Sequence, residues 1–334
     1  MSHTIRIALA ALVLSAGAVL AQPQPGSPSG QNPTTRAVNE EQLLREFERL
    51  DGRVTIPDSK AATLEQPQGR EWRTFREGWL PWIAGIAILG MLLALVIFYF
   101  TKGRVRLDHS EESGTKILRF NTFERFTHWL TASSFIVLGL TGLNYIFGKR
   151  ILMPLIGPDA FSALSQWGKY AHNYLAWPFM LGILFMMVVW LRDNIPNRVD
   201  AAWLKAGGGF LGDAHPSAGR FNAGQKIVFW IVMLGGIAMS VTGIILMFPI
   251  SAVDVNGIQL NQAIHAIIGV LFVAAILAHI YIGSLGMEGA YDAMGSGEVD
   301  LAWARRHHDL WVEEQQAKTA SGPQLGGSRP IPAE

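Results

Sequence analysis

The sequence of 334 residues contains no cysteine. Disulfides, thiolate-ligated zinc, cysteine-held iron–sulfur clusters and a cysteine nucleophile are therefore excluded within this chain. Any metal ion must be held by histidine, methionine, tyrosine or carboxylate side chains. Charged residues are also scarce, at 16%, and the formal net charge of +1 gives no indication of nucleic acid as a partner.

Hydrophobic residues make up 50% of the chain, and the mean hydropathy is +0.25. A value this high is unusual for a soluble domain and favours a protein that lies in a membrane. The 11 tryptophans and 17 phenylalanines fit the aromatic belts and the packed interior of a helical membrane bundle.

The N-terminal segment, 1–21, has the pattern of a secretory signal peptide. Arg6 supplies the positive start, residues 7–20 form a short apolar core, and Ala21 is a small residue before the expected cut. A short uncleaved signal anchor is the alternative. Residues 22–79 are mostly polar, and we expect a periplasmic arm or linker there, with one short amphipathic helix at 39–50.

Apolar stretches follow, each close to the ~20 residues that a helix needs to cross a bilayer. They cover residues 80–100, 126–147, 168–191, 226–248 and 261–285. The sequence therefore predicts an all-α integral membrane protein, in which the last four spans form a four-helix transmembrane bundle and the first is an extra N-terminal transmembrane helix. We expect a cytoplasmic linker at 101–116, the four-helix domain at 117–300, and a partly disordered cytoplasmic tail at 301–334.

The charge of the loops predicts the orientation. Lysines and arginines are frequent in the connections at 101–125 and 192–226, whereas the connection at 148–167 has two of them and the one at 249–260 has none. Positively charged loops are retained in the cytoplasm. We therefore expect a multi-pass protein of the bacterial inner membrane, with its C-terminus in the cytoplasm and its N-terminus, after signal cleavage, in the periplasm.

The chain has nine histidines. His3 lies in the signal segment, and four others in polar loops or the tail are expected to be solvated: His109, His215, His307 and His308. The remaining four lie at or inside apolar spans: His128, His172, His265 and His279. Because polar groups are costly in lipid, a function is the default expectation for these four.

Helical geometry pairs the four membrane histidines. His265 and His279 are 14 residues apart in one span, which is roughly 21 Å along the axis, and the second returns to within about 40° of the first. The last span therefore has one imidazole near each membrane surface. By the expected topology, His128 begins its span at the inner side and His172 at the outer side. We predict that His128 faces His279, and that His172 faces His265.

Two facing histidines at each of two depths fit the axial ligation of two stacked b-type haems, because neutral imidazole is an iron ligand and haem can lie between helices. Gly269 and Gly283 each follow a predicted ligand by four residues, where a glycine would admit the ring, although ordinary helix packing would also explain them. Arg125 and Lys169, each three residues before a predicted ligand, are candidates for pairing with haem propionates.

Other uses of membrane histidines fit less well. A non-haem di-iron site would need clustered H-x-x-x-H repeats, and a haem–copper centre would need more histidines at one depth. A proton-relaying transporter usually needs carboxylates within the membrane, and the last four apolar spans contain no aspartate or glutamate. The sequence favours electron transfer across the bilayer, with a haem-free membrane anchor and a transporter as the alternatives.

The segments around the histidines resemble a known family. The resemblance rests on five motifs, which are RFNTFERFTHWLTASSFIVLGLTGL, GKYAHNYLAW, AGRFNAGQKIVFW, VTGIILMF and NQAIHAIIGVLFVAAILAHIYIGSL. They are similar to the gamma subunit, a cytochrome b, of membrane-bound respiratory formate dehydrogenases. The similar part covers roughly 117–300. The wider dihaem family includes the cytochrome b subunits of nickel–iron hydrogenases and thiosulfate reductases.

The resemblance implies a role in respiratory electron transport, with no catalytic residue for substrate oxidation in this chain. An iron–sulfur beta subunit, fed by a molybdenum or tungsten catalytic alpha subunit, would supply electrons at the outer haem, and quinone would be reduced near the inner haem. Besides membrane lipid, these subunits and quinone are the expected partners. A hydrogenase or another quinone-reducing dehydrogenase is the alternative parent complex, and a higher oligomer of the complex is left open.

The resemblance also implies a location for quinone. In the family the quinone site lies beside the inner haem, near the loop that enters the third core helix. In this chain that loop reads FNAGQK, so the candidates for binding quinone are Asn222, Gly224 and Gln225. Helix capping by Asn222 is the alternative explanation for that residue.

Overall fold

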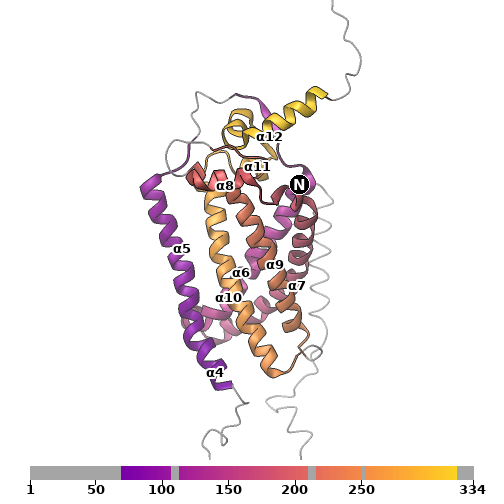
Figure 1. Ribbon diagram of the computed structural model, residues 1–334. Coiled ribbons are helices and arrows are strands. Elements are labelled where there is room, and N and C mark those ends of the chain that lie inside the picture. The colour runs from indigo at the N-terminus through magenta and orange to yellow at the C-terminus, as the bar shows by residue number, and fades with distance from the viewer. Residues whose placement is uncertain (1–68, 107–112, 210–215, 250–252, 322–334) are drawn as a thin grey trace, which may run out of the picture. The chain divides into compact units, whose positions relative to one another are not determined.

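The computed structural model describes residues 69–106, 113–209, 216–249 and 253–321, all within one compact unit of the chain (Figure 1). Several predicted features lie outside the described residues: the signal peptide at 1–21, the amphipathic helix at 39–50, His3, His109 and His215. The described part is mainly helical.

Five helices of the described residues are long and apolar enough to cross a membrane. They are α5 (Leu80–Lys102), α6 (Thr122–Ile156), α7 (Pro158–Trp190), α9 (Ala223–Met247) and α10 (Val255–Tyr281). The predicted all-α membrane fold is confirmed. With 35 and 33 residues, α6 and α7 are longer than the predicted spans, because polar residues at their ends continue each helix beyond its apolar segment.

Side-chain caps determine where three core helices begin. Asn121 accepts hydrogen bonds from two backbone N–H groups of the first turn of α6, and the Glu124 carboxylate accepts one from the Asn121 N–H. Asn222 and Gln225 form the same capping box at the start of α9, and Asp254 caps α10. These side chains satisfy N–H groups that a helix start leaves unpaired.

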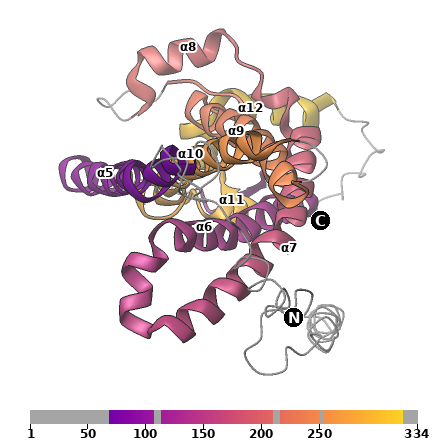
Figure 2. The same ribbon diagram turned by 90° about the horizontal axis from the view of Figure 1, so that it is seen from below.

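A single residue connects α6 to α7. Gly157 has a φ of +82°, a left-handed conformation that glycine adopts without the steric cost of a Cβ atom. Pro158 then opens α7 with its φ already fixed near the helical value. Because no longer loop intervenes, α6 and α7 form a helical hairpin, and Figure 2 shows its connected end extending away from the other helices.

Close approach between helices depends on small residues facing larger ones. Gly182 of α7 lies so near α6 that a Cβ atom on it would overlap the hydroxyl oxygen of Thr131. Farther along the core, the ring centroids of Phe135 on α6 and Phe272 on α10 lie 4.8 Å apart. In lipid, van der Waals packing of this kind holds helices together, since the surroundings are as apolar as the helix surfaces.

The extra helix begins earlier than predicted. A short helix, α4 (Gly69–Thr74), and a π-helical turn (Phe75–Trp79) run directly into α5. Helical structure thus reaches into the segment predicted to be a polar arm. The Phe98 ring of α5 packs edge-to-face on Tyr281 of α10, with centroids 6.3 Å apart, and α5 lies beside α10 at the edge of the bundle (Figure 2).

Shorter elements gather at one end of the bundle, where α6 and α9 begin and α10 ends (Figure 1). They are β1 (Lys116–Leu118), a 3-10 turn (Arg192–Asn194), α8 (Arg198–Lys205), a second 3-10 turn (Gly207–Gly209), a π-helical turn (Ile282–Gly286), α11 (Asp292–Gly295), β2 (Glu298–Asp300) and α12 (Leu301–Ser321). The strands β1 and β2 pair antiparallel, with Ile117 opposite Val299. The strand pair joins the chain before α6 to the chain before α12.

The tail is ordered over α12, further than its polar composition indicates. One side of α12 is buried, including Trp303 and Trp311 at 3% and 4% exposure. His308 is 1% exposed, so the prediction that it is solvated is wrong. A helix can be polar overall and still bury one face when partners are folded against it, which composition alone does not reveal.

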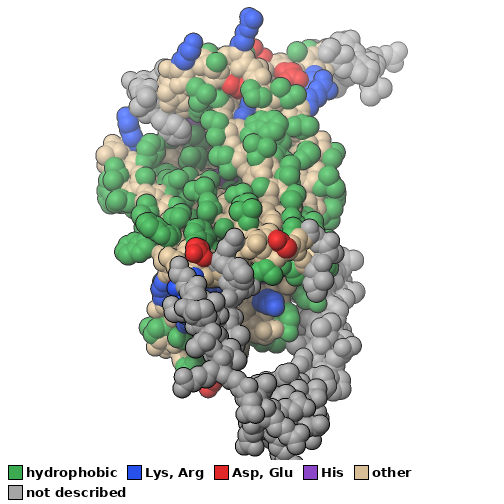
Figure 3. Space-filling model, turned by 60° about the horizontal axis from the view of Figure 1, so that its bottom comes forward, with side chains coloured by type: hydrophobic (Ala, Val, Ile, Leu, Met, Phe, Trp, Pro, Cys, Tyr) green, Lys and Arg blue, Asp and Glu red, His purple; other side chains and the backbone are tan. Residues whose placement is uncertain are grey.

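The outer surface of the bundle is hydrophobic. Figure 3 shows a broad band of hydrophobic side chains across one face, with charged side chains towards the two ends. On α5 the exposed side chains include Trp82, Leu89 and Phe100. This distribution fits a helix bundle that is surrounded by lipid.

Candidate functional site

The first pair of histidines lies near the end of the bundle that carries α12. His128 is in the second turn of α6, and His279 is in the last turn of α10. Their ring centroids are 6.1 Å apart, and the ring planes are inclined by 56°. The structure thus brings together the two side chains that the sequence predicts as the inner pair.

The second pair lies deeper in the bundle, towards its other end. His172 of α7 faces His265 of α10, with ring centroids 6.2 Å apart and ring planes inclined by 60°. Each pair joins α10 to a different helix, α6 or α7. The four side chains predicted as ligands therefore form two separate facing pairs, and no group of three potential metal ligands occurs within the described residues.

The spacing within each pair fits a metal ion between the two rings. A metal–imidazole bond is about 2 Å long and the ring centre lies about 1 Å beyond the nitrogen, so opposed axial ligands have centroids about 6 Å apart. The observed 6.1 and 6.2 Å agree with this value. Two imidazoles and no third ligand are the set that six-coordinate haem iron requires from a protein.

Threonine hydroxyls contact the second pair. Thr141 Oγ1 of α6 lies 2.8 Å from His172 Nδ1, and Thr242 Oγ1 of α9 lies 2.8 Å from His265 Nδ1. In the first pair, His128 Nδ1 is buried and has no hydrogen-bond partner within the described part of the chain. His128 therefore lacks the hydroxyl contact at Nδ1 that both histidines of the second pair have.

The glycines around the histidines have different neighbours. A Cβ atom on Gly142 would lie 3.9 Å from His172 Cε1, and one on Gly243 would lie 3.5 Å from His265 Cε1. Of the two glycines singled out in the sequence, Gly269 faces the Met239 side chain, whereas a Cβ atom on Gly283 would meet nothing within 4 Å. The close approach of backbone to histidine is thus clearest at Gly142 and Gly243.

The two residues predicted to pair with propionates have different surroundings. The Arg125 guanidinium donates hydrogen bonds to the backbone carbonyls of Met294 and Gly295, which ties α6 to α11. The indole N–H of Trp129 also donates to the Met294 carbonyl, at 2.9 Å. Lys169 is exposed on α7. A propionate at Arg125 would share its guanidinium with these carbonyls.

The residues predicted to bind quinone lie together at the start of α9. Asn222 Oδ1 accepts from the Gln225 N–H at 2.9 Å, and Gln225 Oε1 accepts from the Asn222 N–H at 3.0 Å. A Cβ atom on Gly224 would lie 3.2 Å from the Trp203 ring of α8. Capping occupies the side-chain oxygens of both residues, while their amide NH₂ groups take no part in it.

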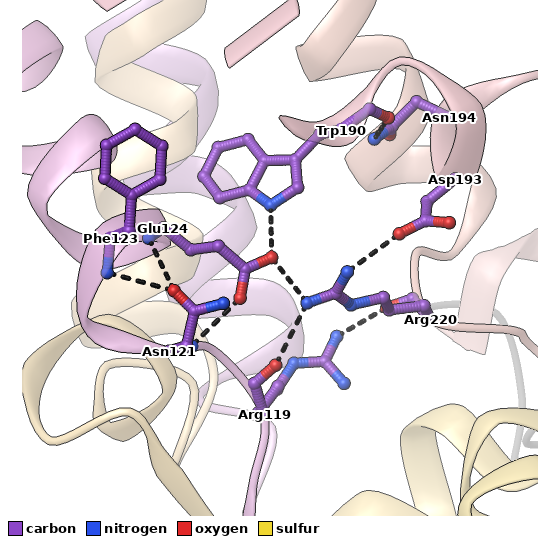
Figure 4. A network of polar contacts seen from close by, with 8 residues as sticks. All are labelled: Arg119, Asn121, Phe123, Glu124, Trp190, Asp193, Asn194 and Arg220. Carbon is purple, nitrogen blue, oxygen red and sulfur yellow. Dashed lines mark hydrogen bonds and ion pairs between the residues drawn. The ribbon is translucent and has the colours of Figure 1, made fainter. Parts of the chain in front are cut away.

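A polar network at the α12 end of the bundle was not predicted from the sequence (Figure 4). The buried Glu124 carboxylate accepts from the Trp190 indole at 2.9 Å and from Arg220 Nη2 at 2.6 Å. Arg220 also donates to Asp193 at 2.8 Å. The network joins the start of α6, the end of α7 and the chain before α9, which lie far apart in the sequence.

A buried arginine extends this network to α12. Arg119 is 3% exposed, and its Nη2 donates to the Arg220 carbonyl at 2.8 Å and lies 2.9 Å from His308 Nε2. Burial, and after it the charge of Arg220, lower the pKa of Arg119, and Glu124 opposes them; the resulting pKa is about 9, so Arg119 stays charged at pH 7. Burial, with Arg119 nearby, also holds the pKa of His308 well below 6.5.

These pairings have a chemical consequence for the two nitrogens of His308. Its Nδ1 lies 2.8 Å from the Gly219 carbonyl, which can only accept a hydrogen bond. Nδ1 therefore bears the proton and Nε2 accepts from Arg119. A neutral His308 satisfies both neighbours, so this histidine has a structural part in holding α12.

A helical membrane bundle with two facing pairs of histidines, at two levels and with spacing suited to iron, defines the class of membrane cytochromes b. The family model of prokaryotic cytochrome b561 matches residues 119–297, and the chain belongs to this family. It is therefore a multi-pass membrane cytochrome b that binds haem b and serves as an electron-transfer subunit. Helix α5 precedes the matched residues.

Curated relatives carry related descriptions. The cytochrome b556(Fdn) subunit of the nitrate-inducible formate dehydrogenase of Escherichia coli K12 is 30% identical over 214 residues, which cover 61% of this chain and 95% of the relative. The formate dehydrogenase cytochrome b556 subunit of Haemophilus influenzae is 26% identical over 207 residues, covering 60% and 84%. A putative cytochrome of Escherichia coli K12, YdhU, is 24% identical over 229 residues, covering 63% and 85%.

Proposed function

We propose that this chain is the cytochrome b subunit of a membrane-bound formate dehydrogenase, holding two haem b groups and delivering electrons to quinone. The observation that carries the proposal is the pair of facing histidine contacts at 6.1 and 6.2 Å on separate levels of one bundle. The named substrate of the relatives, formate, supports the choice among dehydrogenases.

Each haem would be held by two histidines of this chain. His128 and His279 would bind one iron near the cytoplasmic side, and His172 and His265 the other near the periplasmic side. Haem iron, when bound, carries one electron at a time between its ferric and ferrous states. The protein's part is to fix both imidazoles of each pair, to exclude water with the surrounding apolar side chains, and to hold the two levels roughly 21 Å apart.

The orientation proposed from loop charge gives the subunit its direction. An iron–sulfur beta subunit, supplied by a molybdenum or tungsten alpha subunit, would dock at the periplasmic end near His172 and His265. Quinone would bind at the cytoplasmic end, where Asn222 and Gln225 have amide NH₂ groups able to donate to a quinone carbonyl. Protons for the quinol would then come from the cytoplasm, so turnover would separate charge across the membrane.

The proposal is tested by purifying the complex in mild detergent from the cells that make it. We expect two haem b groups per chain by absorbance and iron analysis, and co-purification of an iron–sulfur subunit and a molybdenum- or tungsten-containing subunit. Formate added without air should reduce both haems. His279→Ala should retain one haem per chain, whereas the matched control His307→Ala should retain both.

Each contrary result identifies a different error. Absence of iron from an intact preparation would favour a haem-free anchor or a transporter and end the proposal. Reduction by hydrogen but not by formate would identify another parent dehydrogenase. Retention of both haems in His279→Ala would refute the assigned pairing.

A further inference from the structure

Two short sequence repeats contact the second pair of histidines. The dipeptide Thr-Gly occurs at residues 141–142 in α6 and again at 242–243 in α9. In each copy the threonine hydroxyl reaches Nδ1 of a histidine at 2.8 Å, and the glycine backbone passes the Cε1 atom of the same ring. The two copies come from different helices and serve different histidines, so one arrangement is built twice around one pair.

The direction of these hydrogen bonds follows from the donors present. Thr141 Oγ1 lies 2.7 Å from the Val137 carbonyl, and Thr242 Oγ1 lies 2.7 Å from the Ala238 carbonyl. A carbonyl only accepts, so each hydroxyl gives its single hydrogen to its own helix and offers a lone pair to the histidine. The histidine must then donate from Nδ1. This fixes the tautomer in which Nε2 is free to bind a metal ion.

We propose that Thr141 and Thr242 are positioning residues for the outer haem, and that by accepting the Nδ1 hydrogens of His172 and His265 they lower its reduction potential below that of the inner haem. The inference rests on the proposed function, because it takes the two facing pairs as haem ligands. By this inference, the order in which the two haems pass electrons depends on four side chains of this chain, which are Thr141, Thr242, His172 and His265.

The physical reason lies in the effect of an acceptor on an imidazole. An acceptor at Nδ1–H fixes the orientation of the ring and raises its basicity as a ligand. A more basic ligand stabilises the ferric state over the ferrous state, which lowers the potential. At the inner pair, the buried Nδ1 of His128 has no acceptor within the described residues. The His128 ring should therefore be a less basic ligand to iron.

The two threonines should not be equivalent. The Leu138 backbone carbonyl also lies beside the His172 ring and would partly replace the hydroxyl of Thr141 as an acceptor. For His265 the recorded contact at Nδ1 is the Thr242 hydroxyl, at 2.8 Å. Removing the hydroxyl of Thr242 should therefore have the larger effect.

The experiment is a redox titration of the purified complex, with absorbance and electron paramagnetic resonance as readouts. Thr242→Val and Thr141→Val remove the hydroxyl and preserve the shape of the side chain. Each is combined with His279→Ala, so that the one remaining couple belongs to the outer pair. Thr131→Val is the matched control, because the Thr131 hydroxyl bonds the Thr127 carbonyl of its own helix and meets no histidine.

At a fixed applied potential, we expect Thr242→Val to raise the ratio of reduced to oxidised haem about tenfold. For a one-electron couple this corresponds to a rise of about 59 mV in the reduction potential. Thr141→Val should give a smaller shift in the same direction, and Thr131→Val none. Thr242→Ser, which restores a hydroxyl, should restore the potential. In the single valine variants, without His279→Ala, selective loss of the outer haem would also support the proposal, since contacts to a ligand's other nitrogen contribute to metal affinity.

An unchanged potential in both valine variants, or an equal shift in Thr131→Val, would overturn the inference. So would an outer couple of higher potential than the inner couple in the unmodified protein. These results differ from failure of the proposed function, in which the unmodified protein would contain no haem and no couple would be titrated.

Discussion

Arg220 Nη2 lies 2.6 Å from Glu124 Oε1, in an ion pair between residues 96 positions apart in the chain. Glu124 lies one helical turn before His128, on the same side of α6. The first turns of α6 carry His128, a proposed haem ligand. The ion pair anchors these turns to the chain that leads into α9. The Trp190 indole adds the end of α7 to the same anchor.

Replacing Glu124 should destabilise this end of the bundle. Glu124→Gln keeps the shape of the side chain but leaves the Arg220 guanidinium opposite a neutral amide. Breaking a buried ion pair typically costs 3–5 kcal/mol. Because Arg220 is partly exposed and keeps Asp193, we expect a loss of about 2 kcal/mol in the free energy of unfolding. Thermal denaturation in detergent measures it.

The control for this prediction is Glu314→Gln, which breaks an exposed ion pair with Lys318 on α12. Exposed pairs contribute little, so its melting temperature should stay close to that of the unmodified protein. Equal melting temperatures for both variants would show that the Glu124 contacts do not stabilise the bundle.

The start of α9 allows the capping and quinone roles of Asn222 to be separated. Asn222→Asp keeps the oxygen that caps the helix and removes the NH₂ donor proposed for quinone. We expect an unchanged melting temperature and a KM for quinone raised by about tenfold, as for the loss of one hydrogen bond. Asn121→Asp, at the equivalent cap of α6, is the control and should leave this KM unchanged. An equal rise in KM in the two variants would count against a direct contact with quinone.

His308 should make the protein less stable in mild acid. Its pKa lies well below 6.5 in the folded protein, so it stays neutral there, whereas in the unfolded chain it takes up a proton near pH 6.5. The unfolded state then binds more protons, and the free energy of unfolding falls as the pH falls below 6.5, by up to about 1.4 kcal/mol per pH unit. Tryptophan fluorescence during thermal unfolding follows this change, since Trp303 and Trp311 of α12 are buried.

The comparison for the pH prediction is His308→Asn, which does not titrate and keeps a donor for the Gly219 carbonyl. Its melting temperature should depend less on pH between 7.5 and about 5 than that of the unmodified protein. If both proteins gave the same slope, another group would be responsible.

Packing between α6 and α7 should be sensitive to one methyl group. Gly182→Ala places a Cβ atom against the side chain and backbone of Thr131, and overpacking of this kind costs about 1–3 kcal/mol. Gly90→Ala on α5 adds the same methyl group where nothing lies within 4 Å, and it should be neutral or slightly stabilising. Similar melting temperatures for the two variants would contradict the close approach of α6 to α7.

The pairing of the histidines was accessible from the sequence because it depends on helix geometry and topology alone. Fourteen residues bring His279 back to the face of His265, and the direction of each span then gives each of them a partner. The structure brings the corresponding rings to 6.1 and 6.2 Å. No knowledge of packing was needed, since the bilayer restricts helices to two directions.

The contacts around the histidines were not accessible in this way. Thr141 and Thr242 resemble ordinary helix residues until the neighbouring helix is placed against them. Burial of His308 depends on Arg119, which lies 189 positions away in the chain. Side-chain contacts over such separations follow from tertiary packing, which hydropathy and periodicity do not determine.

The one-residue junction at Gly157 limits how this part of the molecule can change its length. Thr141 stands 16 positions before it and His172 stands 15 positions after it, so the two meet because the arms of the hairpin are almost equal. Inserting one residue in either arm would move one partner by about 1.5 Å and turn it by about 100°. Natural variants should therefore gain or lose residues in both arms together.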